Sequence, residues 1–179
     1  LFKMLVNSAP SLSGRTYANF EWAIPSGTQS PTGTGALSID NLTITTGNLN
    51  INLTAGGISI KGNISIASGT TLGFSPASAN TLTFNGTSAQ VISRLGTLTL
   101  GANEAVVIAN TGSPTASVTF NQAQTVSGSM TVNSGSILAT NATLTLAGTP
   151  AINGSFQINQ GGWATGGTWN YGAGGTLIF

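Results

Sequence analysis

Short clusters in which apolar and polar residues alternate recur along most of the chain. Alternation with a period of two places successive side chains on opposite sides of an extended backbone, so it predicts β-strands. No stretch has the three- and four-residue spacing of an amphipathic helix. The clusters are residues 37–39, 42–44, 49–53, 58–60, 64–66, 72–74, 82–84, 98–100, 106–108, 118–120, 130–132, 144–146, 156–158 and 177–179. The pattern predicts an all-β chain of many short strands.

A longer repeat connects distant clusters. Gly62, Ile64, Ile66, Ser68, Gly69 and Leu72 match Gly128, Met130, Val132, Ser134, Gly135 and Leu138 at a constant offset of 66 residues. The match resumes at an offset of 62, where residues 81–87 correspond to 143–149. The change in offset falls between clusters, so insertions and deletions are expected in turns.

These features favour a β-solenoid, with an array of β-sandwiches as the alternative. Inward positions hold Leu, Ile, Val or Phe and outward positions hold Thr, Ser, Asn or Gly, as expected when each coil stacks its apolar row on the next. Asn and Gly follow strands at Asn85-Gly86, Gly62-Asn63 and Asn153-Gly154, where we expect left-handed backbone in the turns. About three clusters per coil predict five to six coils, roughly 25 to 30 Å in length.

Two regions are expected. Residues 1–36 are interpreted as an irregular N-terminal strand and loop region, with aromatic residues at 17–22 and a loop between Pro25 and Gly35. Residues 37–179 are interpreted as the solenoid repeats, part of a longer chain. A start at Leu1 without Met is typical of an excerpt from a precursor.

Composition excludes several kinds of chemistry. The chain of 179 residues contains no His and no Cys, so Ser-His-Asp and Cys-His systems, ordinary zinc sites and disulfides are ruled out. The four cations are dispersed along the sequence, so we expect no nucleic-acid partner. No run of 18 apolar residues is present, so we expect no membrane insertion. No cofactor or metal is predicted, because the sequence contains neither His nor Cys and has no calcium-loop motif.

The three carboxylates are Glu21, Asp40 and Glu104. A glycoside hydrolase would need two of them to converge on one face. Their wide separation in sequence favours solvated turn residues instead, so we predict that the protein is not an enzyme.

Thr-x-Thr occurs four times, at Thr43/Thr45, Thr81/Thr83, Thr97/Thr99 and Thr143/Thr145. Outward Thr pairs on a solenoid could form a lattice that matches ice. An ice site would repeat once per coil, however, and the gaps here are uneven. The other interpretation is the preference of Thr for strands.

Trp163, Trp169 and Tyr171 form the densest aromatic group. If residues 169–171 form a strand, both of their rings project from one face and could stack on sugars. Packing within the fold is the interpretation that we favour.

Six asparagines head N-x-Ser/Thr sequences, which arise often by chance in a chain of this composition. We expect them to be mostly unmodified, and stacked Asn side chains could form hydrogen-bonded ladders along successive turns. They are Asn41, Asn52, Asn63, Asn85, Asn141 and Asn153.

Three segments, residues 62–72, 81–93 and 170–179, contain the phrases GNISIASGTTL, TLTFNGTSAQVIS and NYGAGGTLIF. They resemble the very large repetitive surface proteins of Bacteroidetes, in which such phrases recur through long β-rich regions, often before a sorting domain for type IX secretion. The resemblance covers roughly residues 37–179. It implies an extracellular, cell-surface adhesin or filament segment of the kind linked to attachment, biofilm and gliding, and it carries no catalytic residues.

The sequence therefore predicts a non-enzymatic structural and adhesive module, part of an exported stalk or filament at the cell surface. Its expected partners are other repeats or copies of the same chain. The alternative is a surface-recognition domain that binds ice or a polysaccharide through an outward Thr/Asn face. No individual binding residue is assigned.

Overall fold

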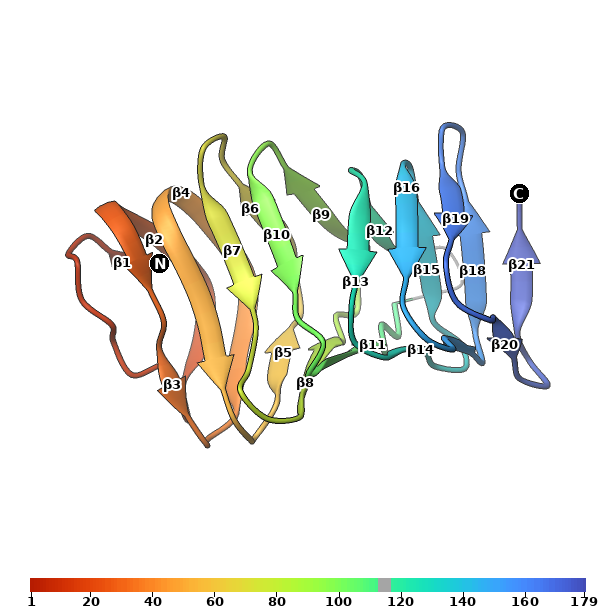
Figure 1. The fold of residues 1–179 in the computed structure, drawn as a ribbon, viewed down its shortest axis with the longest axis horizontal. Coiled ribbons are helices and arrows are strands. Elements are labelled where there is room, and N and C mark those ends of the chain that lie inside the picture. Colours follow the sequence, from red (N-terminus) through yellow and green to blue (C-terminus); the bar gives the residue numbers. More distant parts are fainter. Residues whose placement is uncertain (113–116) are drawn as a thin grey trace.

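The computed structural model describes residues 1–112 and 117–179, and every regular element in this part of the chain is a β-strand (Figure 1). Parallel pairing joins the strands into a β-solenoid of about 8 turns. The prediction of an all-β solenoid is confirmed. The strands are Phe2–Met4 (β1), Thr16–Gln29 (β2), Thr32–Gly33 (β3), Leu37–Leu53 (β4), Ile58–Ile60 (β5), Ile64–Ile66 (β6), Thr71–Phe74 (β7), Asn80–Phe84 (β8), Gln90–Arg94 (β9), Thr97–Leu100 (β10), Glu104–Ile108 (β11), Ser117–Phe120 (β12), Gln124–Val126 (β13), Met130–Val132 (β14), Ile137–Thr140 (β15), Thr143–Leu146 (β16), Ala151–Ile152 (β17), Ser155–Ile158 (β18), Trp163–Thr165 (β19), Asn170–Tyr171 (β20) and Thr176–Ile178 (β21).

The long strands β2 and β4 each span three faces, and from β5 onward successive strands occupy the three faces in turn. Face 1 contains the starts of β2 and β4, then β5, β8, β11, β14, β17 and β20. Face 2 contains β1, the middle parts of β2 and β4, then β6, β9, β12, β15, β18 and β21. Face 3 contains the ends of β2 and β4, then β7, β10, β13, β16 and β19, and it is turned toward the viewer in Figure 1.

The register on face 1 defines the number of turns. One inward column runs through Tyr17, Ile39, Ile60, Phe84, Ile108, Val132, Ile152 and Tyr171. Eight such levels at about 4.8 Å each correspond to roughly 35 Å of parallel ladder. The prediction of five to six coils is therefore wrong. The count was too low because the predicted solenoid excludes residues 1–36, which contain β2, and because strands such as β9, β13 and β15 have the polar residues Gln90, Gln124 and Thr140 at buried positions, which breaks the apolar alternation.

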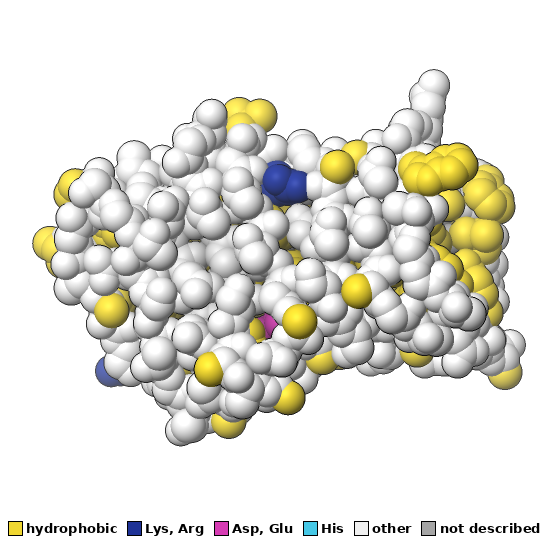
Figure 2. All heavy atoms as spheres, in the orientation of Figure 1, with side chains coloured by type: hydrophobic (Ala, Val, Ile, Leu, Met, Phe, Trp, Pro, Cys, Tyr) yellow, Lys and Arg dark blue, Asp and Glu magenta, His cyan; other side chains and the backbone are white. Residues whose placement is uncertain are grey.

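The core is a continuous stack of aliphatic and aromatic side chains. Leucine, isoleucine, valine and phenylalanine fill the inward positions of all three faces, and most of them are fully buried. Burying this apolar surface is the main favourable contribution to folding, at roughly 25 cal/mol per Å². Figure 2 shows the result from outside: the middle of the visible surface is mostly uncharged and polar, and the larger apolar patches lie toward one end.

The N-terminal region is more regular than predicted. Strand β2 pairs with β4 from Thr16↔Ser38 to Gln29↔Leu49, so parallel pairing of the solenoid is present before residue 37. The prediction of a loop is wrong for residues 25–29, which belong to β2. The register shifts between Ala23 and Thr28, and this irregularity accommodates Pro25, which has no backbone N–H to donate.

Residues before β2 cover one end of the stack. β1 pairs with β2 on face 2, and the Leu12 side chain in the following segment is fully buried. Met4 is buried as well. Figure 1 shows this segment at the end of the solenoid that carries the N-terminus.

Glycine has two separate roles in the turns. Gly69 and Gly135, which match in the sequence repeat, have φ of 75° and 77°, the left-handed region that favours glycine. The glycines at 62, 86 and 154 do not have positive φ, so the left-handed prediction is wrong there. A Cβ at Gly86 would collide with the Lys61 carbonyl oxygen of the neighbouring coil, so close backbone approach is what requires glycine at that position.

The sequence repeat relates strands on different faces. Residues 64–66 form β6 on face 2, whereas the matching residues 130–132 form β14 on face 1. Residues 81–84 belong to β8 on face 1, and their counterparts belong to β16 on face 3. A strand and its turn therefore recur eight strands later, and eight strands do not make a whole number of coils.

Within the described residues, no helix is long and apolar enough to cross a membrane.

Candidate binding face

The three carboxylates occupy three different environments. Glu21 lies outward on face 2 and forms an ion pair with Lys3, with 2.8 Å between Oε1 and Nζ. The Thr45 hydroxyl donates to the same oxygen at 3.2 Å. The hydrogen bond from Lys3 is the main reason that the pKa of Glu21 is lowered.

Asp40 and Glu104 lie on face 1 but are far apart. Asp40 follows Ile39 in the second level of the face 1 column, and Glu104 begins the strand that reaches its fifth level at Ile108. Three levels correspond to about 14 Å along the axis, beyond the roughly 5 to 9.5 Å between the carboxyl groups of a glycosidase. The structure therefore does not bring these carboxylates together. No cluster of three or more potential metal ligands (His, Cys, Asp or Glu) occurs among residues 1–112 and 117–179.

Glu104 lies inside the solenoid. Its side chain is fully buried beside Asn80 of the preceding turn, so its interpretation as a solvated turn residue is wrong. Neither carboxylate oxygen has a hydrogen-bond partner. Burial disfavours the charged form and raises the pKa of Glu104 to about 7.

The four Thr-x-Thr pairs are distributed over all three faces. Thr43/Thr45 lies on face 2 and Thr81/Thr83 on face 1. The pairs at 97/99 and 143/145 both lie on face 3, two turns apart. The structure thus brings two of the four pairs onto one face.

A threonine column forms on face 3. Thr99, Thr125, Thr145 and Thr165 occupy the same outward position on four successive turns. We call these four residues the Thr column. The adjacent outward position holds Thr97, Ala123, Thr143 and Trp163, so a second column is interrupted twice. The result is one row of hydroxyl groups, more widely spaced where β10 and β13 diverge, beside a second row that is interrupted.

A groove interrupts face 3 within the Thr column, between Thr99 and Thr125. Strands β10 and β13 pair only at Leu100↔Val126, whereas β7 and β10 pair over four residues. The groove has a volume of about 290 Å³. Its lining consists of Arg94, Thr97, Leu98, Thr99, Leu100, Ala123, Gln124, Thr125 and Ser127.

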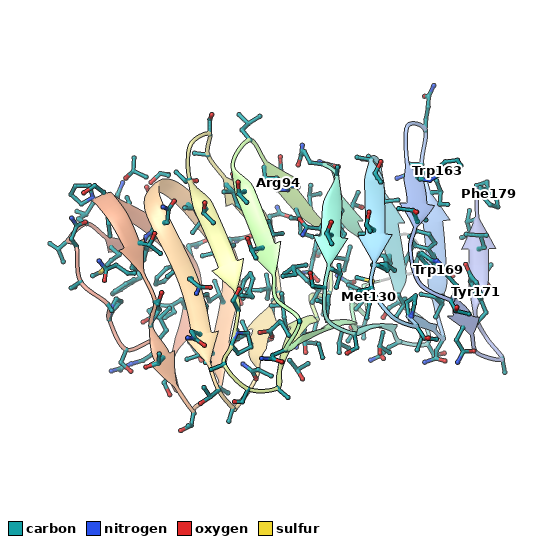
Figure 3. All side chains as sticks on the ribbon, in the orientation of Figure 1. Arg94, Met130, Trp163, Trp169, Tyr171 and Phe179 are labelled. Carbon is teal, nitrogen blue, oxygen red and sulfur yellow. The ribbon has the colours of Figure 1, made fainter. Side chains whose placement is uncertain are left out.

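Two side chains set the polarity of this groove. The Arg94 guanidinium donates from Nη1 to the Gly96 carbonyl at 3.0 Å and from Nη2 to the Ala123 carbonyl across the groove. Gln124, which is 4% exposed, donates from Nε2 to the Leu98 carbonyl at 3.3 Å and to its neighbour Thr125 at 2.7 Å. Its Oε1 is buried and accepts no hydrogen bond. Figure 2 shows one Lys or Arg side chain on the middle of this face, at the position where Figure 3 labels Arg94.

Sequence reasoning missed both residues. Arg94 gave no signal, because a lone cation between strands is ordinary. Gln124 did carry one: it stands between Leu98 and Leu144 in an inward column, where the alternation calls for an apolar residue.

The aromatic group at the C-terminal end is divided. Trp169 packs against Phe156 with ring centroids 4.9 Å apart, and its Nε1 donates to the Gly166 carbonyl at 3.1 Å. The packing interpretation is confirmed for Trp169. Trp163 and Tyr171 are exposed, and Figure 3 shows Trp163 well separated from the other two rings.

The predicted asparagine ladders are present at the corners on either side of face 2. Asn141 donates to Asn121 Oδ1 at 2.7 Å and accepts from Asn159 Nδ2 at 2.6 Å. Nearer the N-terminus, Asn41 donates to Asn19 Oδ1 at 3.0 Å and accepts from the backbone N–H of Asn63 at 2.9 Å.

The remaining sequon asparagines behave differently. Asn52 accepts from the Ala77 N–H at 2.9 Å, and Asn85 accepts from the Ser59 hydroxyl at 2.6 Å. At Asn153 no ladder bond is described, so the ladder interpretation holds for part of the set.

No protein-family model, no curated protein and no solved structure matches this chain.

Proposed function

We propose that this chain is a non-enzymatic structural and adhesive module of an extracellular, cell-surface stalk or filament. One observation carries the proposal: large apolar side chains are exposed mainly at the two ends of the described stack. The segment before β2 buries Leu12 but leaves Leu1 84% and Val6 61% exposed, and the C-terminal turn leaves Leu177 41% and Phe179 89% exposed.

The exposed residues of the C-terminal turn continue the columns of the core. Leu177 pairs with the fully buried Phe156 on face 2, and Tyr171 pairs with Ile152 on face 1. This end therefore has the shape and chemistry to receive another β-coil, as a module in a stack would. The uncharged Thr, Ser and Asn surface lets such modules approach one another without strong repulsion.

Sedimentation velocity over a range of concentrations tests this proposal. The wild-type chain is expected to associate end to end into particles about twice as long, which negative-stain microscopy would measure. Leu177→Lys combined with Phe179→Ser should abolish association, because both changes place polar groups on the C-terminal end. Leu95→Lys is the matched control, since this leucine is 82% exposed but lies in the β9–β10 loop on the side of the solenoid. A wild-type chain that stays monomeric at all concentrations would contradict the stacking role.

A second candidate function is recognition of a polysaccharide or ice through face 3, and the Thr column favours it. Thr125→Tyr places a bulky ring in the middle of the column and should abolish binding to an insoluble polysaccharide, or inhibition of ice recrystallisation, whichever the wild type shows. Thr83→Tyr on face 1 is the control. Equal effects of the two variants would exclude face 3 as the recognition surface.

A further inference from the structure

We propose that the groove between β10 and β13 binds a carboxylated sugar unit of an acidic polysaccharide. The inference rests on the second candidate function, recognition through face 3, and gives it a location and a substrate class. Arg94 would hold the carboxylate, and Gln124 would accept a hydrogen bond from a sugar hydroxyl.

Arg94 supplies a positive charge that no carboxylate of the described chain neutralises. Among residues 1–112 and 117–179, the one ion pair joins Lys3 and Glu21 at the N-terminal end. The two hydrogen bonds of the guanidinium to Gly96 and Ala123 leave further N–H groups, since arginine has five. These contacts also fix the guanidinium at the groove, so a carboxylate meets a pre-positioned donor.

Gln124 supplies a hydrogen-bond acceptor, because its Oε1 has no donor in the described part of the chain. Its neighbours in the column, Leu98 and Leu144, show that an apolar side chain fits this level of the stack. The Nε2 donates to the Leu98 and Thr125 carbonyls, but the buried Oε1 without a partner is unfavourable for the fold. Simple carboxylate or sulfate ions bring no donor at neutral pH, whereas a sugar hydroxyl does. A ligand with both a negative charge and hydroxyl groups satisfies Arg94 and Gln124 together.

The rest of the lining fits the same ligand. Thr97, Thr99, Thr125 and Ser127 place hydroxyl groups around the groove, and the edges of Leu98 and Leu100 offer apolar contact to the face of a sugar ring. Beyond the groove, the Thr column continues through Thr145 and Thr165 toward the C-terminal end. A polysaccharide lying along the axis would therefore meet further hydroxyl groups on each turn.

Isothermal titration with tri-galacturonate, and with galactotriose as its neutral counterpart, tests the proposal. The wild-type chain is expected to bind tri-galacturonate more tightly than galactotriose. Arg94→Gln should weaken binding of the acidic sugar by about tenfold or more, because a charge-assisted hydrogen bond is lost. Lys61→Gln is the matched control: it removes the same charge from an exposed position between β5 and β6, and should leave affinity unchanged.

Gln124→Leu separates binding from folding. The variant completes an apolar column, so its melting temperature should rise while its affinity for tri-galacturonate falls. A rise in melting temperature with unchanged affinity would overturn the role of Gln124. Arg94→Gln binding as tightly as wild type, or equal binding of acidic and neutral sugars, would overturn the role of Arg94.

Failure here is distinguishable from failure of the broader proposals. A wild-type chain that binds no acidic oligosaccharide overturns the groove site. If it still binds a neutral polysaccharide in a Thr125-dependent manner, recognition through face 3 stands without this site. End-to-end association is measured separately and depends on Leu177 and Phe179, which lie outside the groove.

Discussion

Glu104 is the titratable residue with the least typical environment, since its carboxyl group is fully buried without a hydrogen-bond partner. Its pKa is raised to about 7 from an ordinary value of 4.5. Near neutral pH it can therefore remain protonated at little cost, while at higher pH the solenoid must bury a charge or open locally.

Stability should consequently fall as the pH rises from about 4.5 to about 7. In this window the folded chain binds more protons than the unfolded chain, so the free energy of unfolding decreases with pH. The full effect is no more than about 3 kcal/mol. Urea denaturation at pH 5 and pH 8 measures it, and the chain has no histidine to titrate in the same range.

Glu104→Gln should remove most of this pH dependence. The amide has nearly the same shape and does not ionise, so the two urea midpoints should nearly coincide. A pH slope that persists in the variant would mean that another group causes it.

Gly86→Ala tests the close approach between coils. The added methyl group would collide with the Lys61 carbonyl oxygen, so we expect a loss of roughly 1 to 3 kcal/mol in the free energy of unfolding. Thermal and urea denaturation would measure it. Ser88→Ala in the same turn is the control, with an expected change within about 0.5 kcal/mol. Equal stability of the two variants would show that the neighbouring coil yields easily at this point.

At the level of strands, hydrogen bonds between outward side chains reinforce the backbone ladder. Asn121, Asn141 and Asn159 stack on three successive turns at the corner that follows face 2. Because the side chains are partly solvated, each bond contributes modestly, about 1 kcal/mol at most.

Asn141→Ala should reduce the free energy of unfolding by about 1 to 2 kcal/mol, because it removes the central member and both bonds. A shift in the urea midpoint is the measurement. Asn133→Ala, at an exposed position on face 1, should change the midpoint little. If both variants behave alike, the ladder contributes nothing beyond β-propensity.

The sequence predicts strands well where inward residues are apolar and poorly where they are polar. The clusters at 64–66, 82–84 and 106–108 are strands with nearly the predicted bounds. Strand β13 was missed because Gln124 occupies its first inward position. A groove arises from how neighbouring turns diverge, and that divergence depends on contacts between residues more than twenty positions apart, which periodicity does not encode.

Considered whole, the stack formed by residues 1–112 and 117–179 has a first turn that is partly covered by the segment before β2 and a last turn that is paired on one side. The segment that buries Leu12 shields the first turn, whereas β20 and β21 lie at the edge of the ladder with exposed side chains. Local opening is easiest where neighbouring contacts exist on one side alone.

Hydrogen exchange should therefore follow a gradient along the axis. Amides in β20 and β21 are expected to exchange faster than those in β8 and β11, which have paired strands on both sides. Mass spectrometry of peptides from a time course measures this at low protein concentration, where ends do not associate. Uniform protection along the chain would contradict the gradient.

The offset between the sequence repeat and the coil has a consequence for how the surface would be displayed. A unit of eight strands, with three strands to a turn, advances about two and two thirds turns, so each copy is rotated by about two thirds of a revolution relative to the one before. In an array extended by copying this unit, equivalent outward side chains would follow a helical path around the solenoid axis. The same side chains would face the same direction again only after three copies. A surface that contacts the solenoid from one side would therefore meet each motif at widely spaced intervals.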